Sequence, residues 1–181
     1  MTRSYSSLVK GTLALAALAG CATAPQSAGE KEDIKSNAQS SLDTARKNDP
    51  SLAKVLDKAV AYAVFPSVGK GAVGVGGAYG RGVLYEAGAM TGYCDVSQVT
   101  IGIQLGGQTY AEIIAFEDKS AAERFKKNEV AFSGQASAVA IKSGAGANAK
   151  YNNGVAVFTM SESGLMYEAS LGGQKFSYQA K

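Results

Sequence analysis

The spacing of hydrophobic and polar residues predicts helices first and strands afterwards. Between residues 30 and 60, apolar residues recur at intervals of four, four and three, which places them on one face of a helix. These positions are Ile34, Ala38, Leu42 and Ala45. Asp49 and Pro50 then restart the chain, because Asp caps helices and Pro is tolerated at their first position. A second helix is therefore expected over residues 50–60.

From residue 61 onward the period changes to two, and the segment is rich in Gly and in β-branched and aromatic residues. Residues 99–105 alternate most strictly, with Gln and Gly on the second face. Residues 153–154 and 172–173 are hairpin signals, Asn-Gly and Gly-Gly. One helix is expected inside this region, over residues 120–127. The predicted fold class is α+β: N-terminal helices packed on a Gly-rich, mainly antiparallel sheet or barrel-like meander with one inserted helix.

The first twenty residues have the layout of an export signal. Arg3 and Lys10 precede a short apolar run over residues 11–19. This run is much shorter than the roughly 20 apolar residues that cross a bilayer, so it is read as a cleaved segment. Residues 18–21, Leu-Ala-Gly-Cys, resemble the bacterial lipobox, whose cysteine receives diacylglycerol. Cys21 is therefore the predicted lipidation site, and a chance cysteine behind an ordinary signal peptide is the alternative.

Removing this signal leaves 161 of the 181 residues, a length that suits one domain. We expect a flexible tether over residues 21–29 and a single domain over residues 30–181, helical to residue 60 and mainly β after it. The loss of Arg3 and Lys10 also lowers the net charge from +3 to +1. Such a balance argues against a nucleic-acid partner.

Catalytic chemistry finds little support, because the chain contains no His. Ser-His and Cys-His nucleophiles and His-containing metal sites are thereby excluded. We expect no enzyme activity, no metal site and no cofactor. Four carboxylates near predicted strands, Glu86, Asp95, Glu112 and Glu168, show no paired spacing and are expected to be solvated strand ends. The second cysteine, Cys94, is expected to be a buried apolar side chain, with a reactive thiol as the alternative.

Residues 69–74 match the dinucleotide-binding pattern G-x-G-x-x-G. That site needs a helix directly after the glycines, and further glycines follow instead, each costing a helix about 1 kcal/mol relative to Ala. A closely packed, strongly bent strand is the preferred interpretation.

Several glycine-containing blocks resemble the SYLF domain family, in order and spacing. They cover roughly residues 48–178: the opening blocks at 65–71 and 74–84, the middle blocks at 91–93 and 102–108, and the closing segments at 164–166 and 170–172. Cys94 departs from the pattern, since an aromatic residue often follows Gly-Tyr there.

The resemblance implies phospholipid binding, with the membrane contact near the start of the domain. In this chain the implied lipid-binding residues are Lys54, Lys58, Phe65, Lys70 and Arg81. The lysines would meet phosphates at about 1 kcal/mol each near an anionic surface. The alternative is that the apolar residues pack the helices on the sheet while the lysines face water. Eukaryotic members are associated with actin, but actin is not expected as the partner of an envelope protein.

Two functions from different classes remain. The first is a lipoprotein whose SYLF-like domain binds phospholipid, in the inner leaflet of the outer membrane and facing the periplasm. Ala22, rather than Asp, follows Cys21 and by resemblance to sorting signals favours that membrane. The second is a structural or protein-interaction component of the envelope. Since acyl chains would already secure attachment, lipid binding by the domain is expected to serve recognition or transfer.

Overall fold

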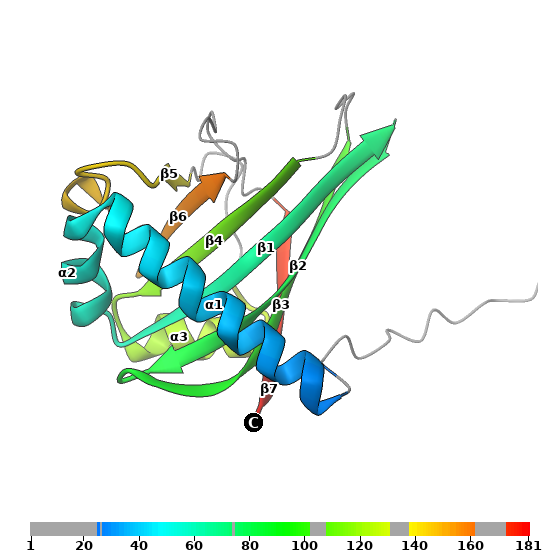
Figure 1. Cartoon of the computed structure of the whole chain (residues 1–181), viewed down its shortest axis with the longest axis horizontal. Helices are drawn as coiled ribbons and strands as arrows, with labels where there is room; N and C mark the ends of the chain where they lie inside the picture. Colours follow the sequence, from blue (N-terminus) through cyan, green and yellow to red (C-terminus); the bar gives the residue numbers. More distant parts are fainter. Residues whose placement is uncertain (1–24, 26, 74, 102–107, 131–137, 162–172) are drawn as a thin grey trace, which may run out of the picture.

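The computed structural model of the chain describes residues 25, 27–73, 75–101, 108–130, 138–161 and 173–181. Their helices are α1 (Ala28–Asn48), α2 (Pro50–Lys58), α3 (Lys119–Lys126) and the short 3-10 helix η1 (Gly146–Asn148). Their strands are β1 (Ala61–Val73), β2 (Val75–Glu86), β3 (Ala89–Ile101), β4 (Gln108–Phe116), β5 (Val139–Ala140), β6 (Val155–Ser161) and β7 (Gln174–Ala180). This arrangement (Figure 1) confirms the predicted α+β class.

The strands form one sheet in the order β5-β6-β4-β1-β2-β3-β7, and only the β5–β6 pairing is parallel. The sheet is open but strongly curled. Gln174 of β7 donates from Nε2 to Oε2 of Glu112 on β4 at 3.0 Å, although three strands separate them in the sheet. With about 4.8 Å between neighbouring strands, β4 and β7 would lie about 19 Å apart in a flat sheet. Curling brings them together and creates a concave interior.

The central strand β1 is bulged, which contributes to the bend. Its register shifts against both β2 and β4 around Pro66. Proline has no N–H to donate to the ladder, so it is tolerated in a sheet at such an irregularity. Opposite the bulge, Gly82 lets the two strands approach closely, because a Cβ there would meet Cδ1 of Phe65 at 2.8 Å.

Aromatic rings fill part of the interior. Phe65 and Phe176 lie 6.1 Å apart between ring centroids, and Phe125 of α3 lies 5.0 Å from both Phe116 and Phe176. All four rings are buried, and we call them the aromatic plug. Helix α3 therefore packs on the concave face, where it links β4 to β7. Its first turn is capped by Asp118, whose Oδ1 accepts from the N–H of Ala121 at 2.8 Å.

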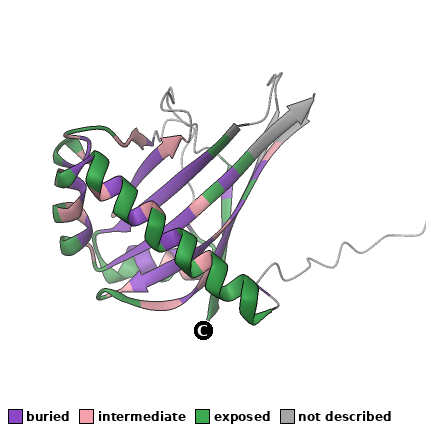
Figure 2. Cartoon of the chain, viewed as in Figure 1, coloured by how far each residue is buried: buried purple, intermediate pink, exposed green. Residues whose placement is uncertain are grey.

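Helices α1 and α2 cover the opposite, convex face of the sheet (Figure 1). A narrow strip of α1, consisting of Ala38, Leu42 and Ala45, is buried against it, and most of the helix faces solvent (Figure 2). The spacing prediction for this helix is thereby confirmed. Helix α1 begins with a capping box: Ser27 Oγ accepts from the N–H of Glu30 at 3.1 Å. Among the described residues, no helix combines the length and the apolarity that crossing a bilayer requires.

Two other helix predictions are confirmed with small shifts. Helix α2 ends at Lys58, two residues before the predicted end, because Ala59 has an extended backbone. Helix α3 covers 119–126, against the predicted 120–127.

The interpretation of the Gly-rich tract as one bent strand is wrong. It forms two antiparallel strands, β1 and β2, that pair up to Val73 and Val75. Residues 153–154 do form a tight turn, with φ of 50° and 77°, but it closes a single bridge between Asn152 and Val155 rather than a long hairpin. The alternating segment 99–105 lies in β3 up to Ile101, and its remainder is outside the described residues.

Candidate functional site

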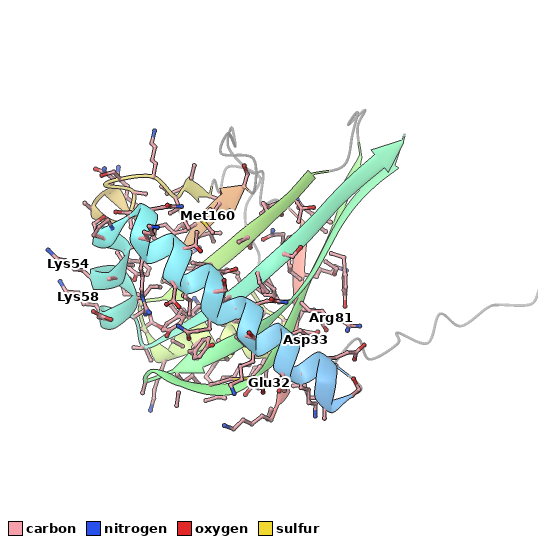
Figure 3. All side chains as sticks on the ribbon, viewed as in Figure 1. Glu32, Asp33, Lys54, Lys58, Arg81 and Met160 are labelled. Carbon is pink, nitrogen blue, oxygen red and sulfur yellow. The ribbon has the colours of Figure 1, made fainter. Side chains whose placement is uncertain are left out.

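The two lysines of α2 are placed for contact with an external partner. Lys54 and Lys58 are both exposed and, four residues apart, lie on one side of the helix (Figure 3). Neither forms an ion pair with a described residue. The other side of α2 is buried through Leu52 and Leu56. The lysine pair therefore projects from a helix whose opposite side is fixed in the core.

Asp49 fixes the start of α2 through hydrogen bonds to both of its carboxylate oxygens. Its Oδ1 accepts from the N–H and Oγ of Ser51 at 3.0 and 2.6 Å, and from the N–H of Gly144 at 3.1 Å. Its Oδ2 accepts from the N–H of Gly146 at 2.6 Å. Burial alone raises the pKa of Asp49, but the hydrogen bonds from Ser51, Gly146 and Gly144 outweigh it and hold the pKa below its usual value. The predicted cap is confirmed, and it also joins α2 to the loop around η1.

A groove of about 780 Å³ runs beside α1, with Tyr85 and Met90 among its lining residues. The helix side carries hydroxyl and ammonium donors together with two carboxylates: Lys35, Ser36, Ser40, Thr44, Lys47, Glu32 and Asp43. A second cavity of about 470 Å³ shares Tyr85 with it and extends between α1 and α2. We call the grooves and the Lys54–Lys58 pair the α1–α2 face. Its donors suit phosphate oxygens, and Tyr85 and Met90 suit an apolar group.

The structure does not bring the predicted lipid-binding residues together. Arg81 lies near the start of α1, far along the helix from Lys54 and Lys58 (Figure 3). It is engaged already, since Nη1 lies 3.8 Å from Oε1 of Glu30 and Nε donates to the hydroxyl of Tyr79 at 3.1 Å.

Phe65 was predicted as an apolar lipid contact, but it is fully buried in the aromatic plug. The expectation that it offers a surface contact is wrong, because the curl of the sheet turns its side chain into the interior. The backbone of Lys70 lies in β1, and its side chain is outside the described residues. Cys21 also lies outside them.

The interior contains a carboxyl group that was expected to be a solvated strand end. Glu112 is fully buried, and its Oε1 has no hydrogen-bond partner among the described residues. Burial raises the pKa of Glu112 to about 7, although the hydrogen bond from Gln174 opposes the shift. Burial, with a contribution from the charge of Glu112, also raises the pKa of the neighbouring Tyr110. The expectation of a solvated strand end is wrong for Glu112.

The other carboxylates differ among themselves. Asp95 is also buried, on the convex face, and accepts from the hydroxyls of Tyr79 at 3.4 Å and Ser177 at 2.9 Å. A solvated strand end is therefore wrong here too, because β7 and Tyr79 cover the group. Glu86 is partly exposed and pairs with Lys126 at 2.8 Å.

Glu168 lies outside the described residues. Cys94 is buried as predicted, and burial, followed by the charge of Asp95, raises the pKa of its thiol well above the usual value. Its side chain acts as a small apolar residue in the interior.

Comparison with known proteins identifies the second half of the chain. Residues 97–181 match the model of the family described as "Las17-binding protein actin regulator". This is the SYLF family, and residues 97–181 of the chain belong to it. Beta cell expansion factor A of Aeromonas veronii is 31% identical over 145 residues, which are 79% of this chain and 55% of the relative. The chain thus spans just over half the length of this curated relative.

The SYLF match contains the interior residues but not the lysine pair. Glu112 and Gln174 fall within the matched residues 97–181, whereas α1 and α2 precede them. The α1–α2 face therefore adds a separate surface to the part that the SYLF model describes.

Proposed function

We propose that this chain is an outer-membrane lipoprotein, anchored through acylated Cys21 and facing the periplasm, whose SYLF domain binds phospholipid on the α1–α2 face. The binding proposal rests on the exposed Lys54 and Lys58, which form no ion pair with a described residue. The anchor rests on the lipobox-like residues 18–21 behind a basic and apolar leader.

The expected energy of this contact is modest. Each lysine near an anionic surface contributes about 1 kcal/mol, so the pair supplies about 2 kcal/mol, or roughly thirtyfold in affinity. The Asp49 hydrogen bonds hold α2 in place before binding, so little ordering of the backbone opposes it. Two or more acyl chains at Cys21 would bind far more tightly than this. The domain is therefore proposed to recognise or transfer a lipid, as a binding protein rather than an enzyme.

Sedimentation with vesicles tests the binding surface. The helices and strands of the described fold begin at Ala28, so non-acylated protein starting at Ala22 keeps all of them. We expect it to sediment with anionic vesicles and not with neutral ones, and to be released by salt. Replacing Lys54 and Lys58 by Gln should weaken binding roughly thirtyfold.

The matched control replaces two exposed lysines on the other side of the sheet, Lys119 and Lys127, by Gln. This variant has the same net charge as the Lys54/Lys58 variant, so it isolates position from overall charge. Equal weakening by both pairs would contradict a specific α1–α2 face. Protein that stays in the supernatant with both vesicle types would refute the lipid-binding proposal itself.

The anchor is tested separately by the intact mass of the mature protein and by membrane fractionation. We expect a mass increased by acyl chains and recovery with the outer membrane. The Cys21→Ser variant should lose both. An unmodified mature chain in the wild type would contradict the anchor and leave the vesicle result unaffected.

A further inference from the structure

Next to the aromatic plug, the concave face changes from apolar to polar. Glu112 pairs in register with Phe65 of β1 on one side and with Thr159 of β6 on the other. Gln174 of β7 pairs with Gln98 of β3. Together with Tyr110 these polar side chains are buried. We call Tyr110, Glu112, Thr159, Gln98 and Gln174 the interior polar layer.

This layer lies beside the middle of the long strands β1 and β2, but near the ends of the shorter strands β4, β6 and β7. Tyr110 pairs with Val68 of β1, and β1 and β2 remain paired for several residues beyond, up to Val73 and Val75. The burial of Glu112 therefore follows from the architecture of the curled sheet.

Two acceptor atoms of this layer, Oε1 of Glu112 and Oε1 of Gln174, have no donor in the described part of the chain. The buried charged side chains of the described residues are Asp49, Asp95 and Glu112. Asp49 and Asp95 each have donors on both carboxylate oxygens. Glu112 has a donor on Oε2 alone, and Oε1 of both Glu112 and Gln174 lacks a partner in the described part of the chain. An unmet buried acceptor costs about 1–3 kcal/mol, so an occupant that brings donors is favoured.

We propose that the interior polar layer binds the primary ammonium group of an amphipathic molecule, with Oε1 of Glu112 and Oε1 of Gln174 as its acceptors. An ammonium group brings three donors and a positive charge, which match a carboxylate beside an amide oxygen. A phosphate or carboxylate brings only acceptors and would be repelled. The apolar side chains next to the layer, Phe65 and Phe176, suit the hydrocarbon part of such a ligand.

The protonation of Glu112 gives this site a pH dependence. Of the side chains that face Glu112 from the adjacent strands, Phe65, Thr159 and Gln174 do not titrate, and Tyr110 stays neutral because its pKa is raised. With a pKa of about 7, Glu112 is mostly protonated at pH 6 and mostly ionised at pH 8. An alkylammonium group stays charged across this range, so its affinity should rise about tenfold from pH 6 to pH 8.

Calorimetric titration of the non-acylated protein tests the site. The probes are dodecylammonium, dodecanol and dodecanoate below their micellar concentrations. We expect dodecylammonium to bind at pH 8 at least tenfold more tightly than either of the others. Glu112→Gln removes the charge at nearly constant volume and should reduce dodecylammonium binding at least tenfold. Asp95→Asn is the matched control, because Asp95 is a buried carboxylate on the convex face, and it should bind like the wild type.

Several results would overturn the proposal. These are unchanged binding by Glu112→Gln, equal binding of dodecanol or dodecanoate, and no binding of dodecylammonium. If Glu112→Gln does not fold, the wild-type series decides, because affinity that does not rise between pH 6 and pH 8 would also contradict the site. The inference does not depend on the α1–α2 face, so replacing Lys54 and Lys58 by Gln should leave dodecylammonium binding unchanged.

Discussion

The two faces of the curled sheet present opposite chemistry. On the convex face, Lys54 and Lys58 extend into water, where the high dielectric limits each to about 1 kcal/mol and salt weakens it. In the interior, Glu112 is fully buried, where an unmet charge or acceptor is much more costly. The convex face therefore offers hydrogen-bond donors in water, where electrostatic interactions are weak. The interior offers acceptors away from water, where such interactions are strong. The convex face suits phosphate, the interior suits an ammonium group, and the sheet keeps the two sites independent.

The largest expected effect comes from opening the interior. Phe176→Ala removes the ring that connects Phe65 of β1 to Phe125 of α3 and should lower the free energy of unfolding by about 3–5 kcal/mol. Denaturant titration measures this value. On the convex side, Val60 is 37% exposed, so Val60→Ala should cost less than about 0.5 kcal/mol. If Phe176→Ala and Val60→Ala lowered the free energy of unfolding by similar amounts, the aromatic plug would not be what stabilises the curled sheet.

The interior carboxyl should make stability depend on pH. The folded pKa of Glu112, about 7, is higher than its unfolded value, so the folded state binds more protons and stability falls as pH rises from about 4.5 to about 7. The loss amounts to about 3 kcal/mol. Glu112→Gln should be more stable than the wild type at pH 8 and should lose this slope.

The control for this effect is Asp95→Asn, since Asp95 is buried with hydroxyl donors on both oxygens. We expect the wild-type slope between pH 5 and pH 8 to persist in that variant. Denaturant titrations at pH 5, 6, 7 and 8 give the comparison. A slope that survives in Glu112→Gln would mean that another group binds the proton.

Local patterns predicted the helices well because short-range physics determines them. The spacing of Ala38, Leu42 and Ala45 and the Asp49-Pro50 start each depend on residues within a few positions. The interior was different. Glu112 lies inside an otherwise apolar run over residues 110–116, and such a run indicates a strand that is buried on both faces. Treating it as a solvated strand end missed this signal.

The partners of Glu112 could not be predicted in the same way. Gln174 is 62 residues away in the chain, and its contact with Glu112 exists only because the sheet curls. Phe65 was misplaced for the same reason. The register and curvature of a sheet depend on bulges and on pairings between distant segments, for which a single sequence carries little local signal.

The next prediction concerns the Asp49 hydrogen bonds, which fix the start of the helix that carries Lys54 and Lys58. In Asp49→Asn, an amide NH₂ would face the N–H of Gly146 or Gly144, so we expect a loss of about 2 kcal/mol in unfolding free energy at pH 7. Because the pKa of Asp49 is lowered in the fold, its contribution is present at neutral pH and is lost as pH falls through that pKa. The wild type and the variant should therefore converge as the pH falls below that pKa, as denaturant titration can show.

Asp57→Asn on the exposed surface of α2 is the control and should change stability little. Vesicle binding gives a second measurement. If α2 must be held in place to present Lys54 and Lys58, Asp49→Asn should also weaken binding to anionic vesicles. If a destabilised Asp49→Asn protein bound vesicles as the wild type does, Lys54 and Lys58 would not need the Asp49 hydrogen bonds for binding.

The smallest expected effect concerns Arg81, a basic residue of the convex face that lies far from α2. Its guanidinium already pairs with Glu30 and donates to Tyr79, so little of its charge is available to a phosphate. We expect Arg81→Gln to change vesicle binding less than about twofold and stability by less than about 1 kcal/mol, as for other partly exposed ion pairs. A tenfold loss of vesicle binding at unchanged stability would contradict this. The lipid contact would then extend along the whole of α1, because only a ligand that displaces Glu30 could recruit Arg81.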